Sequence, residues 1–133
     1  MEENELQEKV LVYRLLEARL NSLLKERELM LSKIIEIQTT LQSIEEIKKG
    51  EEVLFALGSE AYAFGRLKEK DKIIVEIGSN IALEKTFEDA KKTLEKRRVE
   101  MEKALNEVEK SIVEISSRLQ ELAPEIEKLA KGS

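Results

Sequence analysis

A heptad pattern of apolar residues runs through most of this chain, and residues 51–85 are the stretch that interrupts it. Within residues 4–49 apolar side chains recur in alternating steps of three and four, and the same alternation returns in residues 86–131. A pattern sustained over several repeats is typical of a left-handed coiled coil and not of an ordinary surface helix. We therefore predict two helices of about 45 residues, each roughly 65 to 70 Å long at 1.5 Å per residue.

Large apolar residues fill most positions of both predicted helix seams, and cations fill the others. The cations are Lys9 and Arg27 in the first helix and Lys91 and Arg98 in the second. The apolar members are Leu6, Tyr13, Leu16, Leu20, Leu23, Met30, Ile34, Ile37, Leu41, Ile44, Phe87, Leu94, Met101, Leu105, Val108, Ile112, Ile115, Leu119, Leu122, Ile126 and Leu129. Because arms of equal length flank a compact insert, we expect an antiparallel helical hairpin with both termini at the same end.

Local residues mark where the two helices should begin and end. Asn4 followed by Gln7 resembles a capping box, and Thr86 followed by Asp89 is typical of a second helix start. Two lysines and then Gly50 favour the end of the first helix at that glycine.

Residues 51–85 predict four short strands arranged as two hairpins. In each pair, β-branched or aromatic runs are separated by a glycine-containing turn, which is a hairpin signal. The predicted strands are Val53–Leu57, Ala61–Leu67, Lys72–Ile77 and Ile81–Lys85, with turns at Gly58–Glu60 and Gly78–Asn80 and a polar connection at Lys70–Asp71. The chain is then a single domain over residues 1–133, of the α+β class and mostly helical.

The predicted strands carry more apolar surface than so short a segment can enclose. The first strand is apolar on both faces, and Ile74 adds an apolar side chain to the otherwise polar face of its own strand. Apolar strand faces and free edges require a covering partner, so we expect assembly through the strands. The residues expected at this contact are Val53, Phe55, Leu57, Tyr62, Phe64, Ile73, Ile74, Val75, Ile77, Ile81 and Leu83.

The composition argues against an enzyme. The chain has no histidine and no cysteine, so it lacks the commonest metal ligands, a thiol nucleophile and a proton shuttle near neutral pH. Adjacent carboxylates such as Glu45 and Glu46 do not face a common site on a helix, and Gly58–Gly65 lacks the lysine of a phosphate-binding loop. The cations of Lys96–Arg98 are flanked by glutamates in a chain of net charge −5, which favours a solvated face over nucleic-acid binding. We expect no catalytic residue, metal or cofactor.

Nothing in the sequence indicates secretion or a membrane. Without cysteine there are no disulfides, and the N-terminal segment has neither the basic start nor the apolar core of a signal peptide. No run approaches the roughly 18 apolar residues that a membrane span needs. We therefore expect a cytoplasmic protein, and the lysine- and glutamate-rich composition is compatible with a thermophilic source.

The combination of two glycine-turned hairpins between equal heptad arms resembles the archaeal prefoldin alpha class. Members of this class place two hairpins between their coiled-coil helices, where beta-class subunits have one. The resemblance covers essentially the whole chain. Its specific parts are Leu57–Gly58, Lys72–Thr86 (KIIVEIGSNIALEKT), Glu88–Ala90 and Leu122–Glu125 (LAPE).

The resemblance implies a hexamer and a chaperone function. Two alpha-class and four beta-class subunits would pool their hairpins into a double β-barrel body from which six coiled coils extend. Such assemblies hold non-native polypeptides at the coiled-coil tips without ATP and pass them to a group II chaperonin. The expected partners of this chain are therefore beta-class subunits, non-native clients and a chaperonin, with no nucleic acid and no membrane.

The client-binding surface is expected at the tip formed by the two chain ends, where Pro124 should kink or fray the last helical turns. The candidate residues are Leu6, Val10, Leu11, Val12, Leu122, Ile126 and Leu129. For Leu6, Leu122 and Ile126, packing at the end of the seam is at least as good an explanation. Val10, Leu11 and Val12 are more informative, because three consecutive helical residues cannot all face one partner helix.

Two classes of function stay open at this point. The first is a chaperone subunit that holds clients through several weak contacts. The second is a structural protein, either a filament-forming prefoldin relative or a coiled-coil scaffold that docks one defined partner, because strand contacts that fail to close into a ring produce fibres.

Overall fold

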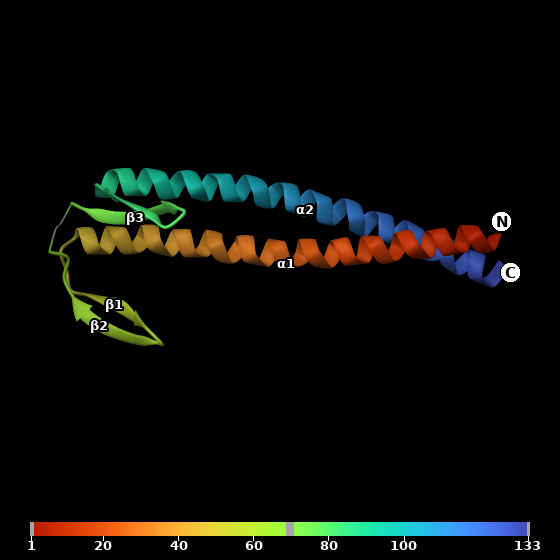
Figure 1. The fold of residues 1–133 in the computed structure, drawn as a ribbon, viewed down its shortest axis with the longest axis horizontal. Coiled ribbons are helices and arrows are strands. Elements are labelled where there is room, and N and C mark those ends of the chain that lie inside the picture. The colour runs from red at the N-terminus through yellow and green to blue at the C-terminus, as the bar shows by residue number, and fades with distance from the viewer. Residues whose placement is uncertain (1, 69–70, 133) are drawn as a thin grey trace. The chain divides into compact units, whose positions relative to one another are not determined.

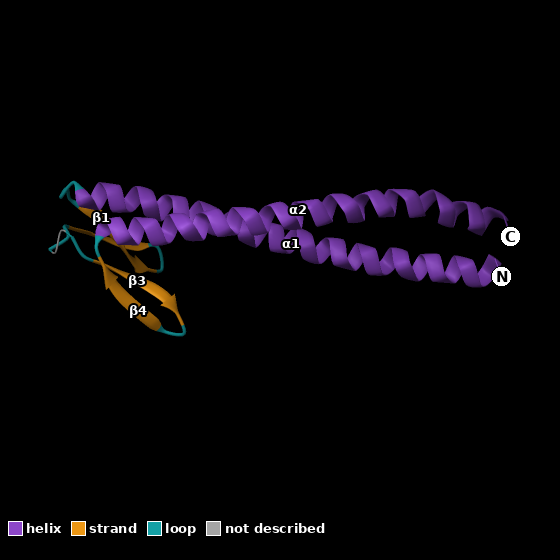
Figure 2. Ribbon diagram, turned by 90° about the horizontal axis from the view of Figure 1, so that it is seen from above, coloured by secondary structure: helices purple, strands orange, loops and turns teal. Residues whose placement is uncertain are grey.

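The computed structural model describes residues 2–68 and 71–132, which form two long helices and four short strands (Figures 1 and 2). In chain order the elements are α1 (Glu2–Lys48), β1 (Val53–Gly58), β2 (Ala61–Gly65), β3 (Ile73–Gly78), β4 (Ile81–Lys85) and α2 (Phe87–Gly132). The predicted fold class, mostly helical with two β-hairpins between the helices, is confirmed. Lys70, in the predicted connection between the hairpins, lies outside the described residues.

The chain divides into two compact units, and both long helices contribute to each of them. The terminal unit comprises Met1–Ser32 and Glu102–Ser133, and the strand unit comprises Lys33–Met101. In the terminal unit the two helices lie side by side and the N- and C-terminal ends are close together (Figures 1 and 2). The antiparallel arrangement expected for the two chain ends is therefore present in this unit.

The heptad seam identifies the residues that the helices bury. Each predicted seam position, including the four cations, is buried or half-buried. The most buried apolar members are Leu23, Leu105, Val108, Leu119 and Leu122 in the terminal unit, and Ile34, Ile37, Ile44, Phe87 and Leu94 in the strand unit. This burial confirms the coiled-coil prediction, because positions at alternating steps of three and four form one stripe along a helix.

Two of the predicted helix ends are confirmed by their hydrogen bonds. The backbone N–H of Asp89 donates to Oγ1 of Thr86 at 3.2 Å, so Thr86 caps α2. After α1, the backbone N–H of Gly50 donates to the carbonyl of Ile47 at 3.0 Å, and Gly50 has a φ of 77°. A positive φ of this kind favours glycine, which explains why the helix ends here.

Two other predictions about the helices are wrong. The capping box at Asn4 does not form the helix start, because α1 already begins at Glu2, and its first turn contains three glutamates that complement the helix dipole. Pro124 does not fray the last turns of α2, because the helix continues through it to Gly132. One proline removes only one backbone bond, and beyond it Ile126 and Leu129 remain half-buried in the seam, which holds the last turns in place.

Both hairpins use the same turn. Between β1 and β2 the two turn residues Ser59 and Glu60 have φ values of 51° and 63°, and between β3 and β4 Ser79 and Asn80 have 49° and 63°. Two consecutive left-handed residues are typical of a type I′ hairpin turn, whose twist matches that of the strands. In each hairpin the register shifts just before the turn, at a glycine with positive φ that the sequence had indicated as part of the turn.

A small core in the strand unit fixes β3 against the helices. It consists of Ile37, Ile44, Val75, Phe87, Ala90 and Leu94, with Leu41, Ile47, Leu67 and Ile73 packed around it. Arg97 of α2 adds a hydrogen bond of 2.6 Å from Nη2 to the backbone carbonyl of Glu76 in β3. The hairpin formed by β3 and β4 therefore covers the helices with one face only.

Candidate interaction surfaces

The two faces of β3 differ sharply in burial. Val75 is 7% exposed and belongs to the core of the strand unit, whereas the adjacent Ile74 is 72% exposed. This follows from strand geometry, because successive side chains point to opposite faces. On the face that carries Val75, the side chains of Ile77, Ile81 and Leu83 are nevertheless exposed. The hairpin therefore presents apolar side chains on both faces.

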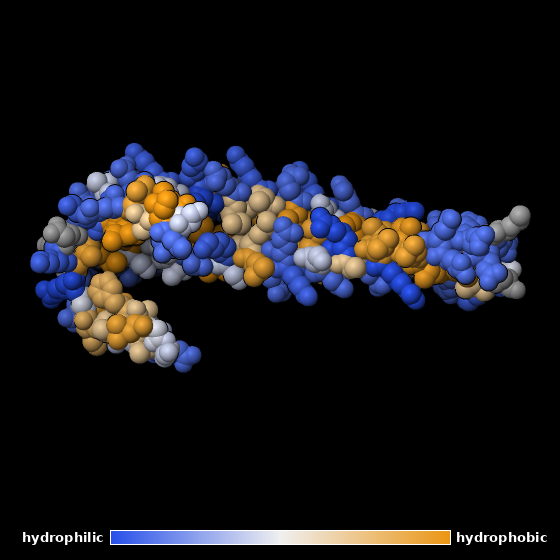
Figure 3. All heavy atoms as spheres, in the orientation of Figure 1, coloured by the Kyte–Doolittle hydropathy of each residue, from blue (hydrophilic) through white to orange (hydrophobic). Residues whose placement is uncertain are grey.

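The β1–β2 hairpin carries an apolar face that nothing in the described chain covers. The register pairs Leu54 with Phe64 and Ala56 with Tyr62, which places these four side chains on one face. Phe64 is 75% exposed, and Leu54 and Tyr62 are exposed as well. Figure 3 shows apolar side chains gathered over this hairpin. So large an exposed apolar patch is typical of an interaction site.

On the opposite face of the β1–β2 hairpin, the ring of Phe55 packs against the neighbouring strand. The ring of Phe55 lies across Gly65, where an added Cβ would be only 3.1 Å from ring atom Cε2. Gly65 therefore makes room for this ring. Between β1 and α1 an open cavity of about 490 Å³ remains, and its apolar lining consists of Ile47 and four consecutive residues of β1, Val53, Leu54, Phe55 and Ala56. The described chain therefore leaves space open along β1.

The structure divides the predicted strand contacts into three groups. The exposed residues are Leu57, Tyr62, Phe64, Ile74, Ile77, Ile81 and Leu83, and the half-buried ones are Val53, Phe55 and Ile73. Val75 faces the helices of its own chain, so it contributes to the subunit core. Sequence reasoning missed the exposed Leu54, which only the cross-strand register places beside Phe64. Each of the two sheets has two strands, so within the described residues every strand has one unpaired edge.

In the terminal unit the predicted tip residues separate into seam and surface. Leu122 is 1% exposed, and Leu6, Val10, Ile126 and Leu129 are half-buried. Leu11 is 58% exposed and Val12 is exposed too. Sequence reasoning missed Leu15, which is 62% exposed and lies one helical turn from Leu11 on the same face. The i, i+4 spacing of the two leucines was the available signal.

A groove lies beside these residues in the terminal unit. It has a volume of about 280 Å³ and is lined by Val10, Tyr13, Arg14 and Glu17 of α1 and by Ala123 and Ile126 of α2. Ala123 has only a methyl side chain, which leaves this space open. Neither Ala123 nor the two charged residues were among the predicted tip residues.

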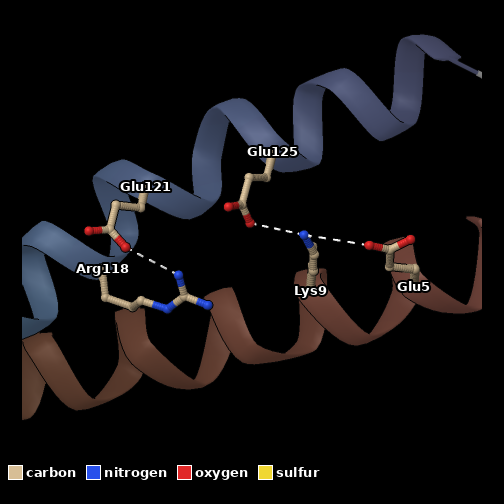
Figure 4. A network of polar contacts seen from close by, with 5 residues as sticks. All are labelled: Glu5, Lys9, Arg118, Glu121 and Glu125. Carbon is tan, nitrogen blue, oxygen red and sulfur yellow. Dashed lines mark hydrogen bonds and ion pairs between the residues drawn. The ribbon is translucent and has the colours of Figure 1, made fainter.

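One ion pair joins the two helices next to the groove, and two further pairs lie within single helices (Figure 4). The Nζ atom of Lys9 lies 2.9 Å from Oε2 of Glu125 and 3.7 Å from Oε1 of Glu5. The hydrogen bond with Glu125 raises the pKa of Lys9, and the same bond lowers the pKa of the Glu125 carboxyl. Arg118 pairs with Glu121 on α2 at 3.2 Å. These exposed pairs set the polar border of the tip.

The strand unit contains a comparable ionic cluster between the helices. Lys91 pairs with Glu45 and Glu88, and Lys48 Nζ lies 3.2 Å from Oε1 of Glu88. The hydrogen bond from Lys91 lowers the pKa of Glu45, and that from Lys48 lowers the pKa of Glu88. The hydrogen bond with Glu45 in turn raises the pKa of Lys91. All four groups are solvent-accessible and join α1 to the start of α2.

The described residues contain little else that could serve as a chemical site. Over residues 2–68 and 71–132, no group of acidic side chains is arranged to hold a metal ion. Within the same residues, neither helix has a stretch apolar and long enough to span a membrane. The surfaces that stand out are thus the strand faces and the tip of the terminal unit.

Comparison with known proteins places this architecture in a family. The family model described as "Prefoldin subunit" matches residues 16–132, which is most of the chain and includes all four strands. This chain belongs to the prefoldin family. Two archaeal relatives confirm the resemblance to the alpha class of prefoldin. Prefoldin subunit alpha of Thermococcus onnurineus is 35% identical over 82 residues, and that of Pyrococcus horikoshii is 30% identical over 90 residues.

The prefoldin match extends to a solved structure. A chain of filamentous PFD from Methanocaldococcus jannaschii, solved by cryo-EM, superposes with a TM-score of 0.70 at 25% identity, covering 84% of this chain and 95% of that one. The sequence alignments are shorter. They cover 59% and 65% of this chain but only 56% and 61% of the Thermococcus and Pyrococcus prefoldins.

Proposed function

We propose that this prefoldin chain is a subunit of an ATP-independent chaperone that captures non-native polypeptides on its terminal unit and passes them to a group II chaperonin. The observation that carries the proposal is the apolar surface of Leu11, Val12 and Leu15, which is exposed on a helix whose seam is already filled by other residues. These side chains lie outside the seam that pairs α1 with α2. An exposed apolar patch beside a polar border fits the capture of exposed apolar segments in clients.

Assembly makes weak capture effective. We propose that the exposed strand residues, above all Leu54, Tyr62, Phe64 and Ile74, contact beta-class prefoldin subunits in a hexamer of two alpha-class and four beta-class chains. Several tips in one particle bind one client with a high effective concentration, so each tip needs only modest affinity. Capture of this kind requires binding surfaces and no chemical step, and it fits a cytoplasmic chaperone subunit that uses neither nucleotide nor metal.

The experiment is an aggregation assay with the purified oligomer. Leu11→Ser together with Leu15→Ser removes the exposed apolar pair, and Leu29→Ser together with Ile35→Ser is the matched control, because these residues are equally exposed elsewhere on α1. We expect the first variant to lose most of its suppression of aggregation of an unrelated denatured protein, without added ATP, while the control retains it. Equal holding by both variants, at unchanged native mass and helix content, would contradict the proposed site.

A filament-forming structural role is the second candidate. It is favoured by the unpaired strand edges and by the likeness to the filamentous PFD of Methanocaldococcus jannaschii. The native mass of the purified chain separates the two functions. A native mass that grows continuously with protein concentration, and does not decrease when beta-class subunits are added, supports the filament. A single defined native mass in the presence of beta-class subunits, as expected of a closed oligomer, supports the chaperone.

A further inference from the structure

We propose that the β1–β2 hairpin is a hinged arm that closes onto α1 in the unassembled chain and covers the free edge of β1. A partner subunit must then displace α1 before this edge becomes available. The inference goes beyond client holding, and it rests only on the proposed assembly through the strands. The arm and the helix onto which it closes both lie in the strand unit, and the contrast between the two hairpins of that unit carries the inference.

The two hairpins differ in how they are held. Hairpin β3–β4 is fixed to the helices, because Val75 is 7% exposed in the core and Nη2 of Arg97 donates a hydrogen bond of 2.6 Å to the carbonyl of Glu76. From β1 and β2 no described residue belongs to that core, and these strands are hydrogen-bonded to each other. A segment with few buried contacts opens more readily than one that is anchored in a core.

Both ends of the β1–β2 hairpin are anchored, and a hinge residue lies inside them. Ile47 before β1 and Leu67 after β2 pack around the core of the strand unit. Between Ile47 and β1, Gly50 has a φ of 77°, which is a left-handed conformation. Glycine changes its backbone angles at little steric cost, so small rotations at Gly50 move the hairpin while its base stays in place.

The open cavity of about 490 Å³ between β1 and α1 is the space into which the arm closes. On the strand side it is lined by the consecutive residues 53–56. Successive side chains point to opposite faces of a strand, so a cavity that touches four in a row lies along the strand edge. Because β2 occupies the other edge of β1, the edge that faces α1 is the unpaired one. Its N–H and C=O groups are a template for pairing with another chain.

The helix side of the cavity offers groups that suit this edge. Ser43, Glu46 and Ile47 of α1 line it. Ile47 provides apolar surface for Val53 and Phe55, which are already half-buried. The carboxylate of Glu46, an exposed residue, can accept hydrogen bonds from unpaired N–H groups of β1. Covering an edge in this way prevents pairing with wrong chains, so closure withholds β1 until a partner competes for it.

The first test closes the arm covalently. Because the chain has no cysteine, Ser43→Cys together with Ala56→Cys introduces one thiol on each side of the cavity and no others. A disulfide requires the two Cα atoms to come within roughly 7 Å, so its formation in the free chain reports closure. Gln42→Cys together with Ala56→Cys is the matched control, because Gln42 is exposed beside Ser43 but does not line this cavity. With oxidised glutathione we expect fast bonding within one chain for the first pair only, and equal rates or no bond would overturn the inference.

Assembly of the same protein shows what closure does. With beta-class prefoldin subunits, the oxidised chain should bind roughly tenfold more weakly than the reduced one, because apparent affinity scales with the fraction of chains in the competent state. Reduction by dithiothreitol should restore binding in the same sample. Equally tight binding before and after reduction would show that closure does not withhold the strand. Failure of the parent chain to join beta-class subunits would instead refute the proposed assembly, whereas the rates of disulfide formation still decide whether the arm closes.

The second test holds the arm open. Ser43→Arg places a long, charged side chain in the cavity, and Gln42→Arg adds the same charge at the neighbouring position outside it. We expect Ser43→Arg to increase severalfold the association of the chain with itself and with beta-class subunits, while Gln42→Arg behaves as the parent does. Native mass measured over a range of protein concentrations gives the comparison. If Ser43→Arg associates no more readily than Gln42→Arg, α1 does not withhold the edge of β1 and the inference is wrong.

Discussion

At the scale of single residues, the same type of residue is buried in one place and exposed in another. Phe87 is 2% exposed and packs in the core of the strand unit, whereas Phe64 faces outward from the β1–β2 hairpin. Ile74 and Val75 repeat this contrast between neighbours on one strand. An aromatic or β-branched residue in this chain therefore stabilises either the subunit or, on our proposal, its assembly.

The two phenylalanines provide a direct comparison. Phe87→Ala should lower the free energy of unfolding by about 3–5 kcal/mol, because it removes a fully buried ring and leaves a cavity. Phe64→Ala should change the stability of the isolated subunit by no more than about 0.5 kcal/mol, as surface substitutions usually do. Chemical denaturation of both variants, at a concentration where the chain is monomeric, measures the difference. Equal losses would mean that the ring of Phe64 is buried within the subunit.

At the scale of elements, periodic patterns were read correctly and capping patterns only in part. The seam was predictable because the repeat itself determines which side chains meet, and all of its positions are at least half-buried. The exposed faces were harder to predict because β1 is apolar on both sides, so only the register with β2 shows that Leu54 lies beside Phe64. The groove escaped prediction because it depends on the small side chain of Ala123, and small residues give no periodic signal.

The start of α2 depends on one hydroxyl group. Thr86→Ala removes the acceptor of the Asp89 N–H bond and should destabilise the strand unit by about 0.5–2 kcal/mol. Thr86→Ser retains the hydroxyl and should lose much less. Thermal unfolding followed by circular dichroism compares the two, and a serine variant as unstable as the alanine variant would mean that the cap contributes nothing.

The ion pairs between the helices predict a dependence of stability on pH. Hydrogen bonds from lysines lower the pKa values of Glu45, Glu88 and Glu125 below their ordinary value of 4.5. A lowered pKa means that the stabilisation is present above pH 4.5 and is lost as the pH falls through the lower, folded-state values. The raised pKa values of Lys9 and Lys91 act in the opposite direction, so their contribution is present below pH 10.5 and is lost above it.

Unfolding temperatures measured between pH 7 and pH 3 test this dependence. A variant with Glu45→Gln, Glu88→Gln and Glu125→Gln should be somewhat less stable than the parent at pH 7 and should lose less on acidification. Because the pairs are exposed, the difference should also shrink in high salt. Parallel pH curves for the parent and the variant would show that these pairs do not couple protonation to folding.

At the scale of the whole molecule, the two units expose different kinds of surface. The strand unit carries exposed strand faces and unpaired edges, and the terminal unit carries exposed apolar side chains and a groove on a well-packed helix pair. Membership of the prefoldin family was predictable from the combination of heptad arms and two glycine-turned hairpins, and the family match confirms it. On our proposal, the strands bring several chains together and the terminal units bind the client.

The most direct test of whether the terminal units bind the client is to measure client holding by an oligomer whose chains lack their terminal tips. Deleting residues 1–12 together with all residues after Leu122 removes Val10, Leu11 and Ile126 but leaves the strands and most of the seam in place. The assay compares suppression of aggregation of a denatured client by the truncated and full-length proteins at equal particle concentration, with native mass measured in parallel. We predict unchanged assembly, a modest fall in unfolding temperature and a steep loss of client holding. If the truncated oligomer holds the client as well as the full-length protein does, the terminal unit is not the binding site.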